Sequence, residues 1–314
     1  METPINSRVK PETASIVRLC VNGRLQRRDT RGDNISAART LIVRALHKDW
    51  PSGVQRVDFT VLPGGFILHQ FPIDLDAINT GWISDNSSFE VLKGYGEKCI
   101  RRVLSEEAIR VLAKRTRYLT IGIDLKHIRD DKIGKKAIKR PHIELVAVLK
   151  LTGRRASIVA WTGKSYPTDE QQHSLVHVVD LSTHCVTVDG LRILVLGCHD
   201  LNMFNPRIPE NKRLGMNRRI RIKNMRSEAE RFEPSIVIQH PHQTDSPRIW
   251  LSGWSGIKKI LPSVEQGLSG IAYFPHPLHR ATRRKLPKVI DGTKFGSNIE
   301  DVVIEGFKET RAKN

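Results

Sequence analysis

Residues 191–207 read LRILVLGCHDLNMFNPR, and this stretch decides both the expected fold and the expected site. Its apolar run 193–196 is typical of a short strand that is buried on both faces. A glycine then interrupts the run, and Cys198, His199 and Asp200 follow directly. Open α/β sheets place their sites at the carboxyl ends of strands, so we expect Cys198 to lie at such a site. The alternative is a small buried cysteine beside an aspartate that caps a helix.

The sequence on either side of this stretch alternates between strand and helix patterns. Residues 15–21 and 57–62 are strand-like, and residues 35–50 between them carry apolar side chains at helical spacing. This order indicates an α/β fold with a sheet that is covered by helices. Residues 69–100 contain several glycines and are expected to form a loop with short helical pieces. Further strands are expected at 118–125, 143–149, 156–161, 175–179, 184–188, 236–239 and 270–274, and further helices at 105–114 and 257–265.

The composition is that of a globular protein with an excess of positive charge. Of 314 residues, 39% are hydrophobic, and 52 Lys and Arg against 33 Asp and Glu give a formal net charge of +19. This balance favours nucleic acid or another acidic ligand as a partner, although a solvated basic surface also accounts for it. The cysteines are widely spaced, no apolar run is long enough to span a membrane, and the first residues lack the apolar core of a signal peptide. We therefore expect reduced thiols, no membrane association and a cytoplasmic location.

The chain shows no linker and no internal repeat, so a single domain over residues 1–314 is expected. Its core is expected at about 15–275. Residues 206–233 contain nine Lys or Arg and are interpreted as a basic insertion, and residues 276–314 as a basic C-terminal tail.

Three short motifs stand in order along the chain. Lys164 heads a loop in AWTGKSYP, after the expected hairpin 143–161. Cys198 ends a strand in ILVLGCHDL, after a tight Asp189-Gly190 turn, and IVIQHPH forms the next strand with a proline-containing loop. This ordered set resembles the nitrilase superfamily of carbon–nitrogen hydrolases over roughly residues 15–275. The resemblance implies an α-β-β-α sandwich, usually paired into dimers, and therefore a homodimer or a higher homo-oligomer.

The resembled family uses a Glu–Lys–Cys set on three loops, and this chain departs from it at the glutamate. The matching place at the end of the second strand reads Val61-Leu62-Pro63-Gly64-Gly65, so the glutamate position falls on Gly64. The residue after the cysteine is usually a bulky aromatic, and here it is His199. A second glutamate often follows the lysine, and Glu170 matches it. The resemblance is therefore to a diverged member.

The resemblance implies a hydrolase of the amidase or nitrilase type. In that mechanism Cys198 attacks an amide or nitrile carbon and forms a thioester-type intermediate. A cysteine of ordinary pKa is only a few per cent thiolate at neutral pH, so it needs a base or a cation nearby. Lys164 would supply the cation and hold the developing oxyanion.

More than one residue is a candidate for the general base, because a glycine stands at the glutamate position. Glu170 is slightly favoured, since it follows Lys164 closely. His199 is adjacent to the cysteine, but neighbouring side chains near a strand end tend to point apart. His240 and His242 end the next strand, and either would reach across the cleft to form a Cys–His pair.

Two other hypotheses concern metal and nucleic acid. The ligand-competent residues Cys198, His199, Asp200, His240 and His242 do not match a standard zinc spacing, so histidines lining a polar cleft are the preferred interpretation, and no metal or cofactor is expected. The basic segments 212–223 and 280–285 would bind phosphates, but they lack the interleaved aromatic residues of a single-strand stacking platform. A diverged, non-catalytic protein that binds an acidic ligand is therefore the alternative function.

Overall fold

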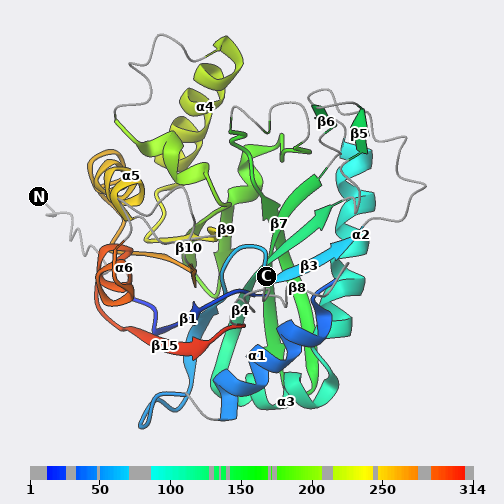
Figure 1. Cartoon of the computed structure of the whole chain (residues 1–314). Coiled ribbons are helices and arrows are strands. Elements are labelled where there is room, and N and C mark those ends of the chain that lie inside the picture. Colours follow the sequence, from blue (N-terminus) through cyan, green and yellow to red (C-terminus); the bar gives the residue numbers. More distant parts are fainter. Residues whose placement is uncertain are drawn as a thin grey trace, which may run out of the picture.

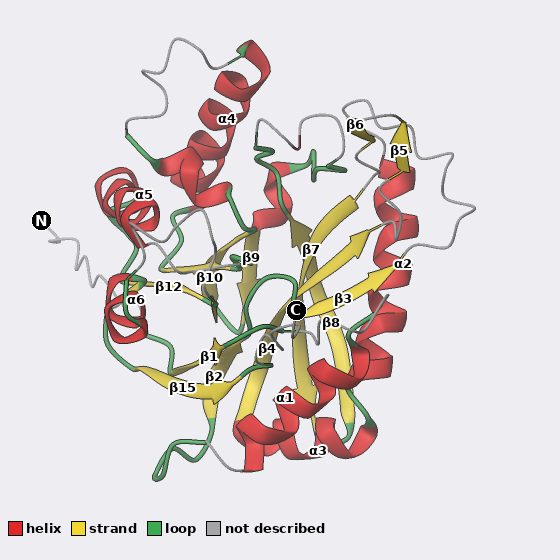
Figure 2. Ribbon diagram, in the orientation of Figure 1, coloured by secondary structure: helices red, strands yellow, loops and turns green. Residues whose placement is uncertain are grey.

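The computed structural model describes residues 13–25, 33–47, 50–70, 86–126, 131–133, 136–138, 142–168, 171, 175–206, 215–242, 247–274 and 284–307. Within these ranges, two sheets lie in the middle of the molecule and helices flank them on both outer sides (Figures 1 and 2). A small separate ribbon joins β5 (Asp131–Ile133) to β6 (Lys136–Ile138).

The first sheet has the strand order β13-β1-β2-β4-β7-β8, with β15 paired to β1 and β3 paired to β4. Its outer face packs against α1 (Ile35–His47), α2 (Asn86–Val103) and α3 (Glu106–Arg115) in one continuous apolar cluster. The strands are β1 (Ile16–Asn22), β2 (Val57–Val61), β3 (Ile67–Gln70), β4 (Thr116–Lys126), β7 (His142–Thr152), β8 (Arg155–Gly163), β13 (Ile271–Tyr273) and β15 (Ile299–Glu305).

The second sheet has the order β14-β12-β11-β10-β9. Its outer face packs against α4 (Met216–Phe232), α5 (Pro247–Ile260) and the short 3-10 turn η4 (Asp200–Phe204). A further 3-10 turn, η3 (Leu181–His184), precedes β9, and α6 (Leu286–Gly292) packs beside β1 and β13. The strands are β9 (Cys185–Val188), β10 (Leu191–Leu196), β11 (Ile236–Gln239), β12 (Gln266–Ser269) and β14 (Lys294–Phe295).

A third apolar cluster fills the space between the sheets. It joins Phe59 and Tyr118 of the first sheet, whose rings stack 5.2 Å apart, to Ile193, Val195 and Ile238 of the second. Strands that are buried on both faces need apolar side chains at successive positions, which explains the unbroken run in β10. The layers are therefore helix, sheet, sheet and helix, and the predicted α-β-β-α arrangement is confirmed.

Several local predictions hold, and one long segment differs. β1, α1 and β2 form a parallel βαβ unit, β7 and β8 form the expected hairpin, and the Ser105 side chain caps α3. Residues 86–103, however, form the continuous helix α2 and not the expected loop. A Cβ on Gly96 would lie 2.9 Å from the Trp161 ring of β8, so the glycine lets the helix approach the sheet closely. The sequence showed this glycine but not the packing that requires it.

Parts of the expected basic insertion and of the expected basic tail are packed in the fold. In the insertion 206–233, the helix α4 buries Ile222, Met225 and Ala229 against the second sheet. In the tail, β15 pairs in parallel with all seven residues of β1, so residues 284–307 belong to the core. The buried Arg18 of β1 donates a hydrogen bond to Asp301 of β15 at 2.6 Å. No helix among the described residues is long and apolar enough to cross a membrane.

Candidate active site

Cys198 lies where β10 ends and its loop meets the loop that follows β8. A Cβ on Gly197 would lie 2.7 Å from the Cα of Lys164, so only glycine allows the two backbones to approach this closely. The amide of Gln239 on β11 donates to the Cys198 carbonyl at 2.7 Å. The cysteine is 6% exposed, and its position is fixed by backbone contacts on both sides.

Asp200 ties the two loops together. Its Oδ1 accepts hydrogen bonds from the backbone N–H groups of Ser165 and Tyr166, at 2.9 and 2.7 Å. Its Oδ2 accepts from the N–H of Gly197 at 2.8 Å. The aspartate is fully buried and starts η4, so it does more than cap a helix. We call Glu144, Lys164, Ser165, Gln171 and Asp200 the lysine wall of the site.

Lys164 is the buried cation of this wall. Its Nζ donates to Oε1 of Glu144 at 3.0 Å and to Oε1 of Gln171 at 2.5 Å. Burial alone would lower the pKa of Lys164, but the negative charges of Glu144 and Cys198 raise it. Burial would likewise raise the pKa of Glu144, yet the positive charges of Lys164 and His242 hold it well below its ordinary value. Both groups are therefore charged at neutral pH.

The opposite side of the site is built from His242, Asp124, Gly64 and Gly65, which we call the histidine wall. Nε2 of His242 lies 2.7 Å from Oδ1 of Asp124, near the end of β4, and its Nδ1 lies 3.5 Å from Oε2 of Glu144. The two glycines leave the room for this arrangement. A Cβ on Gly65 would lie 2.6 Å from the His242 ring, and one on Gly64 would lie 2.3 Å from the His240 carbonyl oxygen.

The charges around Cys198 favour its thiolate. Burial raises the pKa of the thiol, but the positive charges of His199 and His242, and their hydrogen bonds to the sulfur, outweigh burial and lower the pKa to about 5. The backbone N–H of His242 also donates to Sγ at 3.4 Å. Burial lowers the pKa of the His242 imidazole, whereas the charges of Asp124 and Glu144 raise it well above its ordinary value. Cys198 and His242 thus form a thiolate–imidazolium pair.

The sequence-predicted residues have different places in this arrangement. Cys198, Lys164 and His242 come together, while Glu170 lies outside the described residues. His199 stacks on Trp250, with ring centroids 5.9 Å apart. His240 is buried behind Gly64, and burial lowers its pKa to about 3, so it stays neutral and is not suited to serve as the base.

Sequence reasoning missed Glu144 and Asp124. Each is a single carboxylate inside an otherwise apolar strand, in HIELVAVL and YLTIGIDL. A charged residue in a strand that is buried on both faces needs a partner, and this was the available signal.

Within the described ranges, the ligand-competent side chains that come together are Glu144, Cys198 and His242, whose ligand atoms lie within 4.8 Å of one another. The same carboxylate, however, already binds the Lys164 ammonium at 3.0 Å. A metal ion would place a second positive charge beside that ammonium, so we interpret the three residues as part of an ion-pair network and assign no metal ligands.

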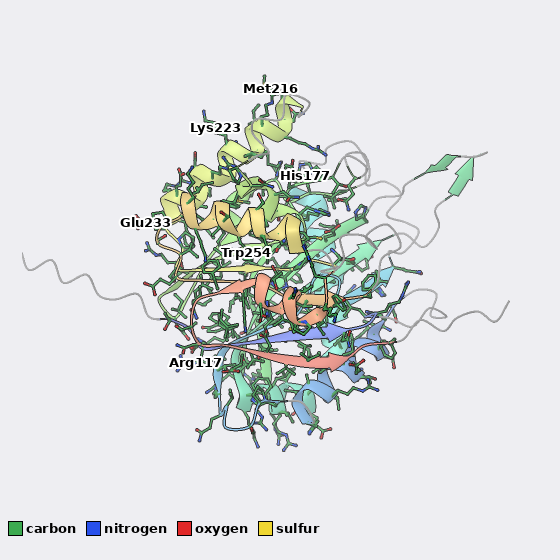
Figure 3. The ribbon with its side chains drawn as sticks, turned by 60° about the vertical axis from the view of Figure 1, so that its left-hand side comes forward. Arg117, His177, Met216, Lys223, Glu233 and Trp254 are labelled. Carbon is green, nitrogen blue, oxygen red and sulfur yellow. The ribbon has the colours of Figure 1, made fainter. Side chains whose placement is uncertain are left out.

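The basic helix α4 uses much of its charge internally. Arg218, Arg221 and Arg226 donate to the backbone carbonyls of Pro167, Val178 and Met203, at 3.0, 2.8 and 2.7 Å. The helix runs away from the sheets from Glu233 to Met216, with Lys223 on its exposed surface (Figure 3). These arginines hold neighbouring loops, which accounts for part of the excess charge without a polyanion.

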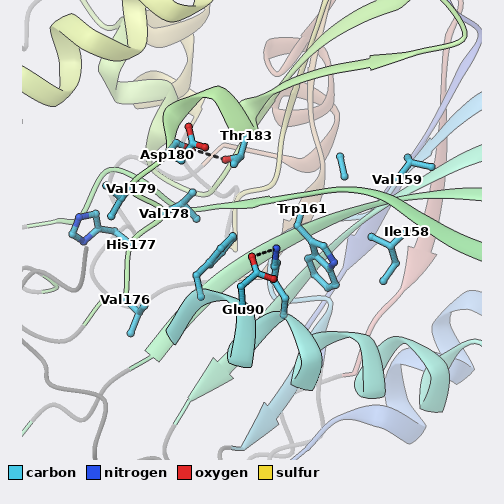
Figure 4. A pocket seen from close by; sticks show the side chains of 13 residues that line it. Glu90, Ile158, Val159, Trp161, Val176, His177, Val178, Val179, Asp180 and Thr183 are labelled. Atoms are coloured by element: carbon cyan, nitrogen blue, oxygen red, sulfur yellow. Dashed lines mark hydrogen bonds and ion pairs between the residues drawn. The ribbon is translucent and has the colours of Figure 1, made fainter. Parts of the chain in front are cut away.

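A separate cavity of about 360 Å³ lies between α2, β8 and residues 176–183 (Figure 4). Trp161, His177 and Asp180 line it, together with apolar side chains such as Val159 and Val179. Neither Cys198 nor Lys164 contributes to its lining, so it is distinct from the candidate active site.

No protein-family model and no curated protein matches the chain. Among solved structures, it is similar to the amidase from Nesterenkonia sp. AN1, with 12% identity, 77% of this chain and 74% of that chain covered, and a TM-score of 0.39. It is similar to XC1258 from Xanthomonas campestris, a CN-hydrolase superfamily protein, with 13% identity, 82% and 76% coverage and a TM-score of 0.39. It is also similar to the glutamine-dependent NAD+ synthetase from Acinetobacter baumannii, with 11% identity, 82% and 38% coverage and a TM-score of 0.44. The structure is thus similar to nitrilase-superfamily amidases and CN-hydrolases, at low sequence identity.

Proposed function

We propose that this protein is a hydrolase of non-peptide carbon–nitrogen bonds in which Cys198 is the nucleophile and Lys164 stabilises the oxyanion. The observation that carries this proposal is the environment of the thiol. A buried cysteine whose pKa is lowered to about 5 is almost entirely thiolate at neutral pH. Keeping a buried thiolate charged requires nearby positive groups that outweigh burial, as they do at Cys198, whereas burial outweighs the nearby cations at Cys20, Cys99 and Cys185 and raises their pKa values.

The proposed reaction begins with attack of the Cys198 thiolate on the carbon of an amide or nitrile. With an amide, negative charge develops on the carbonyl oxygen, and the Lys164 ammonium is the fixed cation beside the nucleophile. Collapse of the tetrahedral intermediate breaks the carbon–nitrogen bond and leaves an acyl thioester on Cys198. Water then hydrolyses the thioester and releases a carboxylic acid.

The test is a screen for an acyl adduct on Cys198. The protein is incubated at pH 6.5 with small amides and nitriles, quenched in acid and mapped by peptide mass spectrometry. An acyl mass on the Cys198 peptide, lost in Cys198→Ala, supports the proposal. Cys185 is a matched internal control, because burial raises its pKa to about 12 and it should stay unmodified.

The alternative is a non-catalytic protein that binds nucleic acid or another acidic ligand. Its specific support is the net charge of +19, which exceeds what the internal contacts of α4 use. If no compound acylates Cys198 and the protein binds oligonucleotides with a steep dependence on salt, the alternative replaces the hydrolase proposal.

A further inference from the structure

The place where the resembled family has its glutamate is occupied here by backbone and by a histidine. Gly64 donates its N–H to the Pro241 carbonyl at 3.0 Å, and a Cβ on this glycine would lie 2.3 Å from the carbonyl oxygen of His240. A glutamate at position 64 therefore does not fit. The adjacent Gly65 has a φ of +58°, and a Cβ there would clash with the ring of His242. The backbone of His240 and Pro241 and the ring of His242 thus occupy this part of the site.

His242 has the contacts that a proton carrier needs. Asp124 binds its Nε2 at 2.7 Å, which fixes the ring orientation and turns Nδ1 toward the site. A ring nitrogen of His242 lies within 4.8 Å of the Cys198 sulfur and of a Glu144 oxygen. The histidine side chain is 29% exposed, so it reaches both the buried sulfur and the side from which water would enter.

We propose that His242, oriented by Asp124, is the acid–base residue that serves Cys198 in place of the family's glutamate. This inference rests on the proposed hydrolase function and assigns its missing proton carrier. Cys198, His242 and Asp124 then have the relation of nucleophile, base and orienting carboxylate, which recurs on unrelated folds. Asp124 acts through the histidine and is a positioning residue.

Among the described residues, the other candidates are less suited to carry the proton. Oε1 of Glu144 binds Lys164 and accepts from Gln171 at 3.1 Å, its Oε2 lies 3.5 Å from Nδ1 of His242, and the two cations hold its pKa well below the ordinary value, which makes it a weak base. The charge of His199 helps to lower the pKa of Cys198, but its ring stacks on Trp250 and has no carboxylate in contact among the residues that the structure describes. His242 combines closeness to the sulfur with a carboxylate that fixes its ring.

The proton balance follows from a resting thiolate and imidazolium. The thiolate attacks the amide carbon, and as the carbon–nitrogen bond breaks, the His242 proton passes to the leaving nitrogen. The amine or ammonia departs, and His242 is neutral. A water molecule then gives one proton to His242 while its oxygen attacks the thioester carbon. The carbon–sulfur bond breaks, which releases the carboxylic acid and restores the thiolate and the imidazolium.

Several charged groups face this pair and set its titration. His242 is faced by Asp124 from β4, by Glu144 from β7, by Cys198 from the loop after β10 and by His240 from its own segment. His199 also faces Cys198. Lys164 and His142 face Glu144. His242 contacts the sulfur, whereas the polar contacts of the His142 ring within the described part of the chain are with Glu144 and Gln171, so the two histidines should differ sharply in their effect on the thiol.

The experiment measures the rate of Cys198 alkylation by iodoacetamide against pH, by peptide mass spectrometry, and needs no substrate. The wild-type profile should have its inflection near pH 5. In His242→Gln the inflection should rise to about 7.5, because His199 remains beside the sulfur, and the rate at pH 6.5 should fall by roughly 10-fold. The matched control His142→Gln should keep the wild-type inflection. An unchanged profile in His242→Gln, or a full shift in His199→Gln alone, would overturn the inference.

Asp124→Asn keeps the shape of the side chain and guards against a folding failure of His242→Gln. Loss of the carboxylate charge should lower the pKa of His242, so the His242 ring, followed by NMR, should lose its proton at lower pH than in the wild type. A ring titration that stays in place would count against the orienting role of Asp124. Folding of each variant is checked by circular dichroism.

A turnover assay separates this inference from the proposed function. With an amide that acylates Cys198, His242→Gln should slow both acyl transfer and thioester hydrolysis by about 10²–10⁴-fold. Normal turnover in His242→Gln would be consistent with the proposed hydrolase function but would contradict the acid–base role of His242. If the wild type turns over no substrate, the hydrolase proposal and the acid–base role built on it both fail, while the alkylation profile still decides whether His242 sets the ionisation of the thiol.

Discussion

The two walls that meet at Cys198 are held in place by opposite means. The lysine wall is a closed polar network, in which Asp200 alone accepts three backbone hydrogen bonds and Glu144 pairs with the buried Lys164. The histidine wall depends on missing side chains, because Gly64 and Gly65 leave the room that the His240–His242 segment occupies. Substitutions that remove side-chain atoms should therefore destabilise the lysine wall, and substitutions that add them should destabilise the histidine wall.

The largest effect is expected for Asp200→Ala. The change leaves three buried N–H donors without their charged acceptor, so we expect a loss of about 4 kcal/mol in the free energy of unfolding. Urea unfolding followed by circular dichroism measures it. Asp180→Ala is the matched control, since this aspartate caps the exposed turn η3 and should cost only about 1 kcal/mol. Equal losses in the two variants would show that Asp200 is an ordinary cap.

Gly64→Ala tests the histidine wall by adding one carbon. The new Cβ would lie 2.3 Å from the His240 carbonyl oxygen, so the loop must shift, at a cost of about 3 kcal/mol in the free energy of unfolding. Gly94→Ala is the control, because a Cβ there meets nothing within 4 Å in the helix α2 and should stabilise the protein by about 1 kcal/mol. A neutral Gly64→Ala would mean that this wall tolerates side chains.

The walls should also differ between pH 5 and 6.5, where the thiolate–imidazolium pair adds to the response of buried histidines such as His177 and His240, whose pKa values burial lowers to about 4 and about 3. Below pH 6.5 His242 is protonated in both states, while Cys198, with a pKa of about 5, is ionised only in the folded state. Through this pair the unfolded chain binds one more proton, so the pair's contribution to stability should fall by roughly 2 kcal/mol as the pH drops from 6.5 to 5.

Above pH 6.5 the unfolded histidine loses its proton, the two contributions cancel, and stability should level off. Denaturant titrations at several pH values measure this curve. In Cys198→Ser the fall between pH 6.5 and 5 should be smaller than in the wild type by roughly 2 kcal/mol, and the part that comes from the buried histidines should remain. A fall of the same size in the serine variant would contradict the contribution of the thiolate.

The smallest effect is expected for Ser165→Ala, at the edge of the lysine wall. Its hydroxyl bonds the carbonyl of Val178 and Nε2 of His184, both at 2.8 Å. Losing these contacts should cost about 1.5 kcal/mol, because the buried histidine nitrogen is left without its partner. Ser227→Ala on the exposed face of α4 should change stability by less than about 0.5 kcal/mol. Thermal unfolding of both variants decides whether the difference exists.

The sequence was sufficient for the strands on either side of Lys164 and Cys198, but only for part of the site. The apolar run of β10, the hairpin β7–β8 and the ends of β8 and β10 were readable because each follows from local periodicity and turn residues. The roles of Asp124 and Glu144 could not be predicted, because they depend on the pairing of β4 with β7, in which these two residues lie opposite each other. Whether the contacting groups are catalytic stays a prediction.

The misread segments share a physical cause. The helix α2 contains glycines that local propensity counts against it, and its packing on Trp161 overrides that propensity. The strand β15 carries alternating exposed charges, in IEDVVIE, because its position lets one face meet solvent. Both elements are defined by what they pack against, which a single sequence does not display.

The pairing of β1 has a consequence for how the chain folds during synthesis. This early strand hydrogen-bonds with β13 and β15, which are more than 200 residues later in the sequence. Its buried Arg18 forms an ion pair with Asp301 of β15. Until that carboxylate has left the ribosome, the arginine must stay hydrated or remain unpaired. Such distant pairing slows folding, so the nascent amino-terminal half should depend on chaperones until the final strand closes the first sheet.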